Sequence, residues 1–161
     1  MSRMEIIEAN LDRADHAQSI LDLTNAYALD PIGGGRTLSP NVRDALIPGL
    51  RSHPTTLVLL AYHGGESVGL ATCFWGFSTF AARPLLNLPD LAVLPKCRGL
   101  GVGRALLRAV EARARERGCS KVTLEVREKN ARARGLYESE GFAHSGSGEA
   151  LGPDLFYVKR L

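Results

Sequence analysis

The sequence has little that would place the protein in a membrane or in an oxidising compartment. None of its apolar runs approaches the length of a transmembrane helix, and its first ten residues are polar and lack the apolar core of a signal peptide. Its three cysteines, Cys73, Cys97 and Cys119, are odd in number and irregularly spaced. This pattern favours bystander thiols over a disulfide framework. We therefore expect a cytoplasmic protein.

Concentrated charge and metal-ligand spacing are also missing. The formal net charge is only +3, and the basic residues form no dense tract. A nucleic-acid partner is therefore not expected, and neither is a membrane partner. The four histidines, His16, His53, His63 and His144, stand at no spacing typical of a metal site. We expect no metal.

The pattern that is present alternates strands and helices, which predicts an α/β (α+β) fold. A chain of 161 residues fits one domain, and it contains no linker or internal repeat. Ser39-Pro40 is typical of a helix start, His63-Gly-Gly-Glu66 of a hairpin turn, and Gly118 of a helix end. We expect strands at 4–9, 56–62, 67–74, 85–93, 121–126 and 154–159, and helices at about 12–27, 40–51, 103–117 and 131–140. Residues 1–161 are predicted to form a single domain.

The chemistry concentrates between residues 91 and 106, where a strand leads through a glycine-rich loop into an amphipathic helix. The loop and the start of the helix contain three glycines and two arginines: Gly99, Gly101, Gly103, Arg98 and Arg104. A helix N-terminus offers unpaired amides and a partial positive charge, and glycines let a ligand approach those amides. The segment therefore predicts a pyrophosphate site.

Two common phosphate-binding motifs do not fit this segment. A P-loop needs Gly-Lys-Ser/Thr, whereas this helix opens Gly103-Arg104-Ala105. The dinucleotide fingerprint GxGxxG fails because Arg104 or Leu106 stands where its last glycine would fall. The remaining alternative without a ligand is a tight strand-to-helix turn.

Three spaced motifs resemble the GNAT superfamily of N-acetyltransferases. The first is Arg98-x-x-Gly101-x-Gly103; the others are Asp90-Leu-Ala-Val93 and Asn130-x-x-Ala133-x-x-x-Tyr137-x-x-x-Gly141-Phe142. They lie within residues 85–142. The resemblance implies a GNAT fold, in which a mixed, mostly antiparallel sheet is flanked by helices. Residues 74–80, with Arg83-Pro84 and Asp90, are also similar to the diamine and polyamine acetyltransferase branch.

The same resemblance implies acetyl-coenzyme A as cosubstrate, held between the strand that ends near Val93 and the strand 121–126. The strand backbone would pair with the pantetheine arm, the loop amides would hold the pyrophosphate, Asn130 would contact the arm, and Tyr137 would lie near the thioester sulfur. The implied cofactor-binding residues are Leu91, Ala92, Val93, Arg98, Gly99, Leu100, Gly101, Val102, Gly103, Arg104, Asn130, Ala133 and Tyr137. A homodimer is also implied.

The implied reaction is attack of an amine on the thioester carbonyl. A backbone amide near Val93 would stabilise the oxyanion, and Tyr137 would hydrogen-bond or protonate the departing sulfur. Because an alkyl ammonium has a pKa of about 10.4, proton removal is valuable at neutral pH. Polyamine-type relatives often carry Glu-Asp where this chain has Pro89-Asp90. Asp90 is our candidate base or amine anchor, Glu125 is a second candidate, and a water relay is a third.

Two other function classes stay open on the sequence. One is a GNAT-fold sensor that binds acetyl-coenzyme A without turnover, and the other is an interaction module in which the glycine loop is only a turn. For an enzyme, the acceptor stays open among polyamines, amino acids, aminoglycosides and protein amines. The resemblance places the Gly33–Gly35 segment where the family shapes its acceptor site. The alternative is that this segment only connects two helices.

Overall fold

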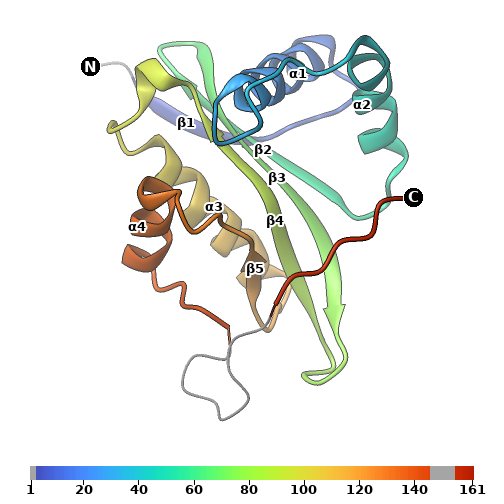
Figure 1. Cartoon of the computed structure of the whole chain (residues 1–161), viewed down its shortest axis with the longest axis vertical. Coiled ribbons are helices and arrows are strands. Elements are labelled where there is room, and N and C mark those ends of the chain that lie inside the picture. The colour runs from blue at the N-terminus through green and yellow to red at the C-terminus, as the bar shows by residue number, and fades with distance from the viewer. Residues whose placement is uncertain (1–2, 146–154) are drawn as a thin grey trace. The chain divides into compact units, whose positions relative to one another are not determined.

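The computed structural model describes residues 3–145 and 155–161. The chain divides into two units, Met1–Glu125 and Val126–Leu161. The first unit contains, in chain order, β1 (Met4–Glu8), α1 (Ala14–Leu29), α2 (Pro40–Ser52), β2 (Thr56–His63), β3 (Glu66–Ser78), β4 (Arg83–Val93), the 3₁₀ turn η1 (Pro95–Cys97), α3 (Val102–Glu116) and β5 (Val122–Leu124) (Figure 1). In the second unit the helix is α4 (Ala131–Ser139).

One five-stranded sheet organises the first unit, in the order β1-β2-β3-β4-β5. The first four strands pair antiparallel, and β4 pairs with β5 in parallel. The predicted hairpin turn is confirmed, since His63 pairs with Glu66 where β2 turns into β3. The predicted α/β architecture with a mixed, mostly antiparallel sheet is confirmed as well.

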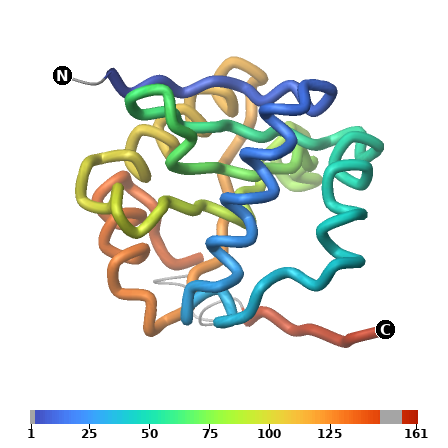
Figure 2. The backbone as a smooth tube through the Cα atoms, turned by 90° about the horizontal axis from the view of Figure 1, so that it is seen from above, coloured from blue at the N-terminus to red at the C-terminus, as the bar shows by residue number. Residues whose placement is uncertain are grey.

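Helices cover both faces of this sheet. Figure 2 shows α1 crossing the strands on one face, with α3 on the opposite face. On the α1 face, Ile20 and Leu23 pack in one buried cluster with Val58, Leu60 and Leu70, and residues of α2 complete it. Successive strand residues point to opposite faces, so β2 and β3 supply the core beneath α1 and the core beneath α3 at the same time.

A glycine of β3 sets how closely α3 approaches the sheet. A Cβ at Gly69 would lie 2.9 Å from Val102, 3.0 Å from Leu106 and 3.1 Å from the Ala92 carbonyl oxygen. Any larger residue would therefore push the first turn of α3 away from β3 and from the end of β4. Gly69 thus places the N-terminus of α3 beside the last residues of β4.

The structure differs from the sequence prediction at several strand ends. β3 runs to Ser78 instead of residue 74, because it pairs along the whole of β4. β5 is limited to Val122–Leu124 because only Leu86–Leu88 of β4 pair with it. The prediction of a strand at 154–159 is wrong over 155–159, where the chain has no regular structure and the residues are exposed. Residue 154 lies outside the described residues.

Residues 3–145 and 155–161 contain no helix that is long and apolar enough to cross a membrane. Within the same ranges, no group of three or more histidine, cysteine or acidic side chains is arranged to suit a metal ion. Cys73, Cys97 and Cys119 are free thiols. No disulfide therefore stabilises the described residues, and their fold is stabilised by the sheet and by the helices packed on it.

Candidate active site

The site begins where β4 and β5 part. One edge of β4 pairs with β3 as far as Val93, but the other edge pairs with β5 only at Leu86–Leu88. Among the described residues, the stretch from Pro89 to Val93 therefore has no strand partner on that second edge. Residues 91–93 of this stretch are those that the family resemblance assigns to the pantetheine arm.

Hydrogen bonding gives the direction of the backbone groups at the end of β4. The Leu94 amide donates to the Val68 carbonyl of β3 at 2.9 Å. Backbone groups alternate in direction along a strand, so the Val93 amide points to the opposite edge, away from β3. The Val93 carbonyl also points there, and it accepts a hydrogen bond from Arg98 Nε at 3.3 Å. An amide at this open edge is in the right place to bind an oxyanion or an acyl carbonyl.

A β-bulge and a pair of side-chain hydrogen bonds lie where β4 separates from β5. Thr72 pairs with Asp90 but Phe74 pairs with Asn87, so two residues of β4, Leu88 and Pro89, oppose one residue of β3. Just before the bulge, Asn87 Nδ2 donates to the Thr123 carbonyl at 3.3 Å and to its hydroxyl at 3.0 Å, which ties β4 to β5. Sequence reasoning missed Asn87, because a single asparagine in a strand carries no motif.

The glycine loop leads directly into α3, as the sequence predicts. Gly101 is the N-cap of α3 and has a φ of +81°. It has no side chain with which to cap the helix, whereas Ser39 caps α2 by accepting from the Val42 amide at 3.4 Å. The first-turn amides of Val102 and Gly103 have no intrahelical acceptor. An uncapped helix start behind a glycine loop suits an anionic ligand.

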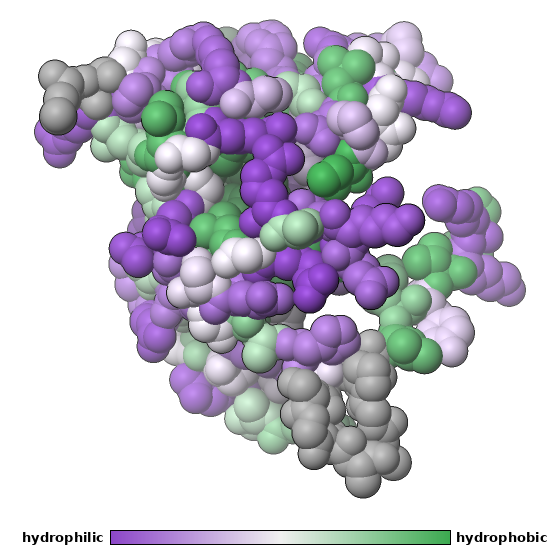
Figure 3. Space-filling view, turned by 60° about the vertical axis from the view of Figure 1, so that its left-hand side comes forward, coloured by the Kyte–Doolittle hydropathy of each residue, from purple (hydrophilic) through white to green (hydrophobic). Residues whose placement is uncertain are grey.

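The surface on this side of the molecule is polar. Figure 3 brings forward the side on which η1 and the start of α3 lie in Figure 1, and hydrophilic residues dominate that face, with hydrophobic residues only in small separate groups.

Arg98, which the family resemblance assigns to the cofactor site, points towards α1 in the structure. One guanidinium nitrogen donates to Asp30 Oδ2 at 2.6 Å, and Nε donates to the Val93 carbonyl. The two side chains are 29% and 14% exposed. Arg98 therefore links the end of β4 to the end of α1.

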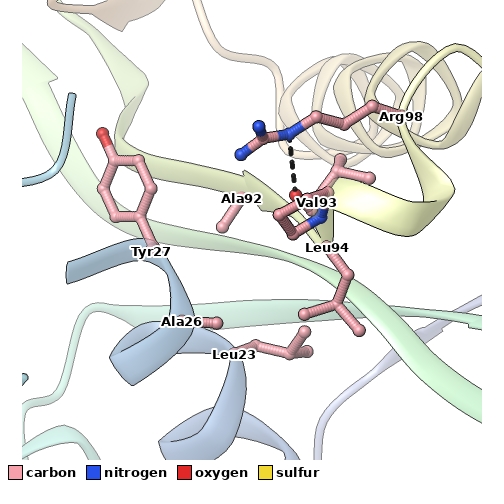
Figure 4. Close-up of a pocket in the computed structure, with 8 residues that line it drawn as sticks. Leu23, Ala26, Tyr27, Ala92, Val93, Leu94 and Arg98 are labelled. Atoms are coloured by element: carbon pink, nitrogen blue, oxygen red, sulfur yellow. Dashed lines mark hydrogen bonds between the residues drawn. The ribbon is translucent and has the colours of Figure 1, made fainter. Parts of the chain in front are cut away.

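A small pocket of about 10 Å³ lies beside this link (Figure 4). The end of β4 and the loop after it supply one wall, and α1 supplies Leu23, Ala26 and Tyr27 as the other. This is about the smallest space that can hold one water molecule. Sequence reasoning did not assign the α1 residues to the site, because the first helix carries no functional motif.

Asp90 follows the bulge directly and is partly buried. Burial raises the pKa of its carboxyl group. Burial, and to a smaller extent the charge of Asp90, also raises the pKa of the Cys73 thiol to about 12. Cys73 is therefore a poor nucleophile at neutral pH, whereas a carboxylate with a raised pKa is a better proton acceptor than an ordinary one. Glu125, the second candidate base, lies beyond the end of β5 and is exposed.

The raised pKa of Asp90 predicts that its ionised form destabilises the fold. A carboxyl group whose pKa is higher in the folded state favours folding below its unfolded pKa, and this contribution is lost as the pH rises through the folded pKa. We expect Asp90→Asn to raise the melting temperature at pH 7, with a gain that shrinks as the pH falls through the folded pKa of Asp90. Thermal unfolding measured between about pH 3 and pH 8, a range that includes the ordinary carboxyl pKa, tests this expectation.

Asp15→Asn is the control of opposite sign. Its hydrogen bond with Arg13 is the main cause that lowers the pKa of Asp15 to about 2, so the ionised form favours the folded state. We expect Asp15→Asn to lower the melting temperature slightly at pH 7, because the solvent screens most of the interaction in this exposed pair. A loss of stability in Asp90→Asn at pH 7 would contradict the assignment.

The predicted site residues of the second unit share one face of α4. Asn130, Ala133 and Tyr137 are spaced by three and four residues, which brings them to the same side of a helix. Asn130 caps the helix by accepting from the Ala133 amide at 3.2 Å. Tyr137 is buried, and its ring lies 5.9 Å from that of Phe142. The third motif thus forms a capped helix that presents its three motif residues together.

Comparison with known proteins bears on these motifs directly. The family model of the acetyltransferase (GNAT) family matches residues 20–142. An uncharacterized N-acetyltransferase of Bacillus subtilis, YhfO, is 33% identical over 93 residues, which are 58% of this chain and 62% of that protein. The match thus spans less than two thirds of that curated relative.

Solved structures show the same fold. A ribosomal-protein-alanine N-acetyltransferase from Brucella melitensis aligns with a TM-score of 0.74 and 21% identity over 99% of this chain and 100% of its own. An aminoglycoside N-acetyltransferase, AAC(6')-Iy, solved in complex with CoA, aligns with a TM-score of 0.74 and 19% identity over 100% and 97%. With the family match across its motifs, this chain belongs to the GNAT acetyltransferase family.

Proposed function

We propose that the protein transfers the acetyl group of acetyl-coenzyme A to a primary amine by direct attack within a ternary complex. The observation that carries the proposal is the open edge of β4, from Pro89 to Val93, beside the uncapped start of α3. The edge offers backbone groups for an extended amide-containing arm, and the helix start offers amides for a pyrophosphate. Acetyl-coenzyme A contains both groups in one molecule.

The geometry supports the proposed binding residues of β4 and the glycine loop, and the family motif alone supports those of α4. Residues 91–93 would pair with the pantetheine arm, the amides between Arg98 and Arg104 would hold the pyrophosphate, and Asn130, Ala133 and Tyr137 of α4 would complete the site. The CoA complex of the aminoglycoside acetyltransferase supports this assignment at the level of the fold. Acetyl-coenzyme A would supply the activated acyl group, and no metal is needed for that chemistry.

The chain's own groups would act on the reacting atoms in three ways. As the amine nitrogen forms its bond to the carbonyl carbon, the Val93 amide would stabilise the charge on the oxygen. As the carbon–sulfur bond breaks, the Tyr137 hydroxyl would donate a hydrogen bond or its proton to the sulfur. Asp90 would take the proton that the amine loses, directly or through water, or would anchor the ammonium group before attack.

A screen for thiol release tests this function. Purified protein with acetyl-coenzyme A would be offered one amine class at a time: spermidine, free amino acids, an aminoglycoside, and a peptide with a free N-terminus and a lysine. We expect one class to release coenzyme A, and mass spectrometry to show the acetylated amine. Tight binding of acetyl-coenzyme A without release by any amine would favour the sensor alternative instead.

The acceptor class stays open within this proposal. The two structural neighbours act, by their names, on a protein alanine and on aminoglycosides, so a shared fold does not select an acceptor. The likeness to the polyamine branch is likewise a prediction, and so are a cytoplasmic location and a homodimer. We also propose one domain over residues 1–161, because the family match extends from the first unit into the second, as far as residue 142.

A further inference from the structure

Asp30 occupies an unfavourable position for an acid, at the C-terminus of α1. Its amide donates to the carbonyls of Ala26 and Tyr27, both at 3.2 Å, which makes it the C-cap residue. The C-terminal end of a helix carries a partial negative charge, and the last turn of α1 has no basic residue to offset it. A carboxylate here needs a cation from another part of the chain.

The same residue organises the loop between α1 and α2. Its carbonyl oxygen accepts from the amides of Gly33, Gly34 and Gly35 at 2.8, 3.1 and 3.0 Å. One carboxylate oxygen, Oδ1, accepts from the Ile32 amide at 3.0 Å. The four successive amides of residues 32–35 thus all donate to oxygen atoms of Asp30. A loop that only connects two helices does not need this much order.

The cation is Arg98, the first residue of the glycine-loop motif. It donates to the other carboxylate oxygen, Oδ2, at 2.6 Å and holds the Val93 carbonyl with its Nε. The pair is 29% and 14% exposed, whereas the Arg13–Asp15 pair is 59% and 60% exposed. A charge-assisted bond in so sheltered a place holds its geometry better than a surface pair does.

These contacts form one connected path between two loops. It runs from the amides of residues 32–35 through Asp30 and Arg98 to the open edge of β4 and the glycine loop. We propose that Asp30 is a positioning residue that couples the order of the loop 31–36 to the binding of the cofactor. This rests on the proposed function, because it takes coenzyme A as the ligand of the glycine loop.

The coupling works in both directions. A ligand seated at the glycine loop fixes Arg98, Arg98 fixes Asp30, and the loop 31–36 loses mobility. By linkage, a loop that is already ordered raises the affinity for the ligand by the same factor. Since Asp30 directly follows the helix that supplies Leu23, Ala26 and Tyr27 to the pocket, the ordered loop stands next to that wall of the site.

Amide hydrogen exchange tests the coupling without any acceptor. In the unsubstituted protein, we expect saturating coenzyme A to slow exchange at residues 32–35 by about fivefold or more, the lower end of typical coupling between sites. In Arg98→Gln, whose substitution lies outside the loop, these amides should exchange faster and coenzyme A should no longer slow them. Asp30→Asn keeps an acceptor for the Ile32 amide but loses the charge, and should behave in the same way.

Coenzyme A affinity gives a second readout through a double-mutant cycle. Each single variant should weaken the binding of coenzyme A by about three- to tenfold. The double variant should bind no worse than whichever single variant binds less tightly, because the two substitutions remove the same interaction. Arg13→Gln, which breaks the exposed pair with Asp15, is the matched control and should change neither affinity nor exchange.

The outcomes separate this inference from the proposed function. Binding of coenzyme A with undiminished protection of residues 32–35 in Arg98→Gln would overturn the coupling alone. Additive losses of affinity in the double variant would do the same. Absence of coenzyme A binding to the unsubstituted protein would overturn the proposed function, and the coupling with it.

Discussion

Replacement of Gly101 by valine is expected to abolish binding of acetyl-coenzyme A. Gly101 has a φ of +81°, and a Cβ built there has no protein atom within 4 Å, so its side chain would project into open space at the start of α3. That space is where we propose the pyrophosphate lies. A β-branched residue would both block the amides and strain the turn that aims them. We expect a loss of affinity of about a hundredfold or more, corresponding to roughly 3 kcal/mol, measured by calorimetry.

The far end of the same helix supplies a matched control. Gly118 has a φ of +71° and likewise has no protein atom within 4 Å of a built Cβ. Gly118→Val therefore introduces similar backbone strain without blocking the proposed site. We expect the two variants to lose comparable thermal stability, while only Gly101→Val loses the ligand. An equal loss of affinity in both would show that general destabilisation is the cause.

Tyr137→Phe is expected to lower kcat by about a hundredfold, the usual lower range for loss of a general acid. Affinity for acetyl-coenzyme A should change little, because the ring and its contact with Phe142 remain. Only the hydroxyl that would meet the leaving sulfur is removed. Steady-state kinetics with the amine found in the thiol-release screen, together with calorimetric titration, separates the two quantities.

Tyr62→Phe is the control for this substitution. Tyr62 is a partly buried tyrosine of β2 that packs against the core beneath α1, and we assign it no role in the reaction. Its kcat should equal that of the unsubstituted protein. Unchanged turnover in Tyr137→Phe would remove Tyr137 from the mechanism, whereas a parallel loss of cofactor affinity would assign it a structural role.

Local patterns in the sequence predict the parts of the fold and site that a short segment can specify. Ser39-Pro40 begins α2, the glycine loop leads into α3, and the turn at His63–Glu66 lies where its residues predict. Each of these signals is a backbone requirement that a short segment expresses by itself. The position of the glycine loop is therefore predictable from the local pattern, whereas the mixed, mostly antiparallel sheet follows from the resemblance to the GNAT family.

Other features depend on contacts between distant segments and leave no periodic trace. Arg98 and Asp30 are 68 positions apart, and nothing near either residue indicates the pair. Asn87 and Thr123 meet only because β4 and β5 pair before they part. The prediction of a strand at 154–159 is wrong for the converse reason: its apolar residues indicate a strand, but the described part of this segment has no pairing partner. Strand propensity expresses packing against a partner more than a preference of the backbone.

Calorimetric titration with acetyl-coenzyme A tests the central claim most directly. We expect saturable binding of one ligand per chain, with a dissociation constant of about 1 μM to 1 mM, the range that Michaelis constants of enzymes usually span. The binding should disappear in Gly101→Val and persist in Gly118→Val. Absence of any binding at millimolar ligand would contradict the proposed function, because the open edge of β4 and the uncapped start of α3 would then hold no cofactor.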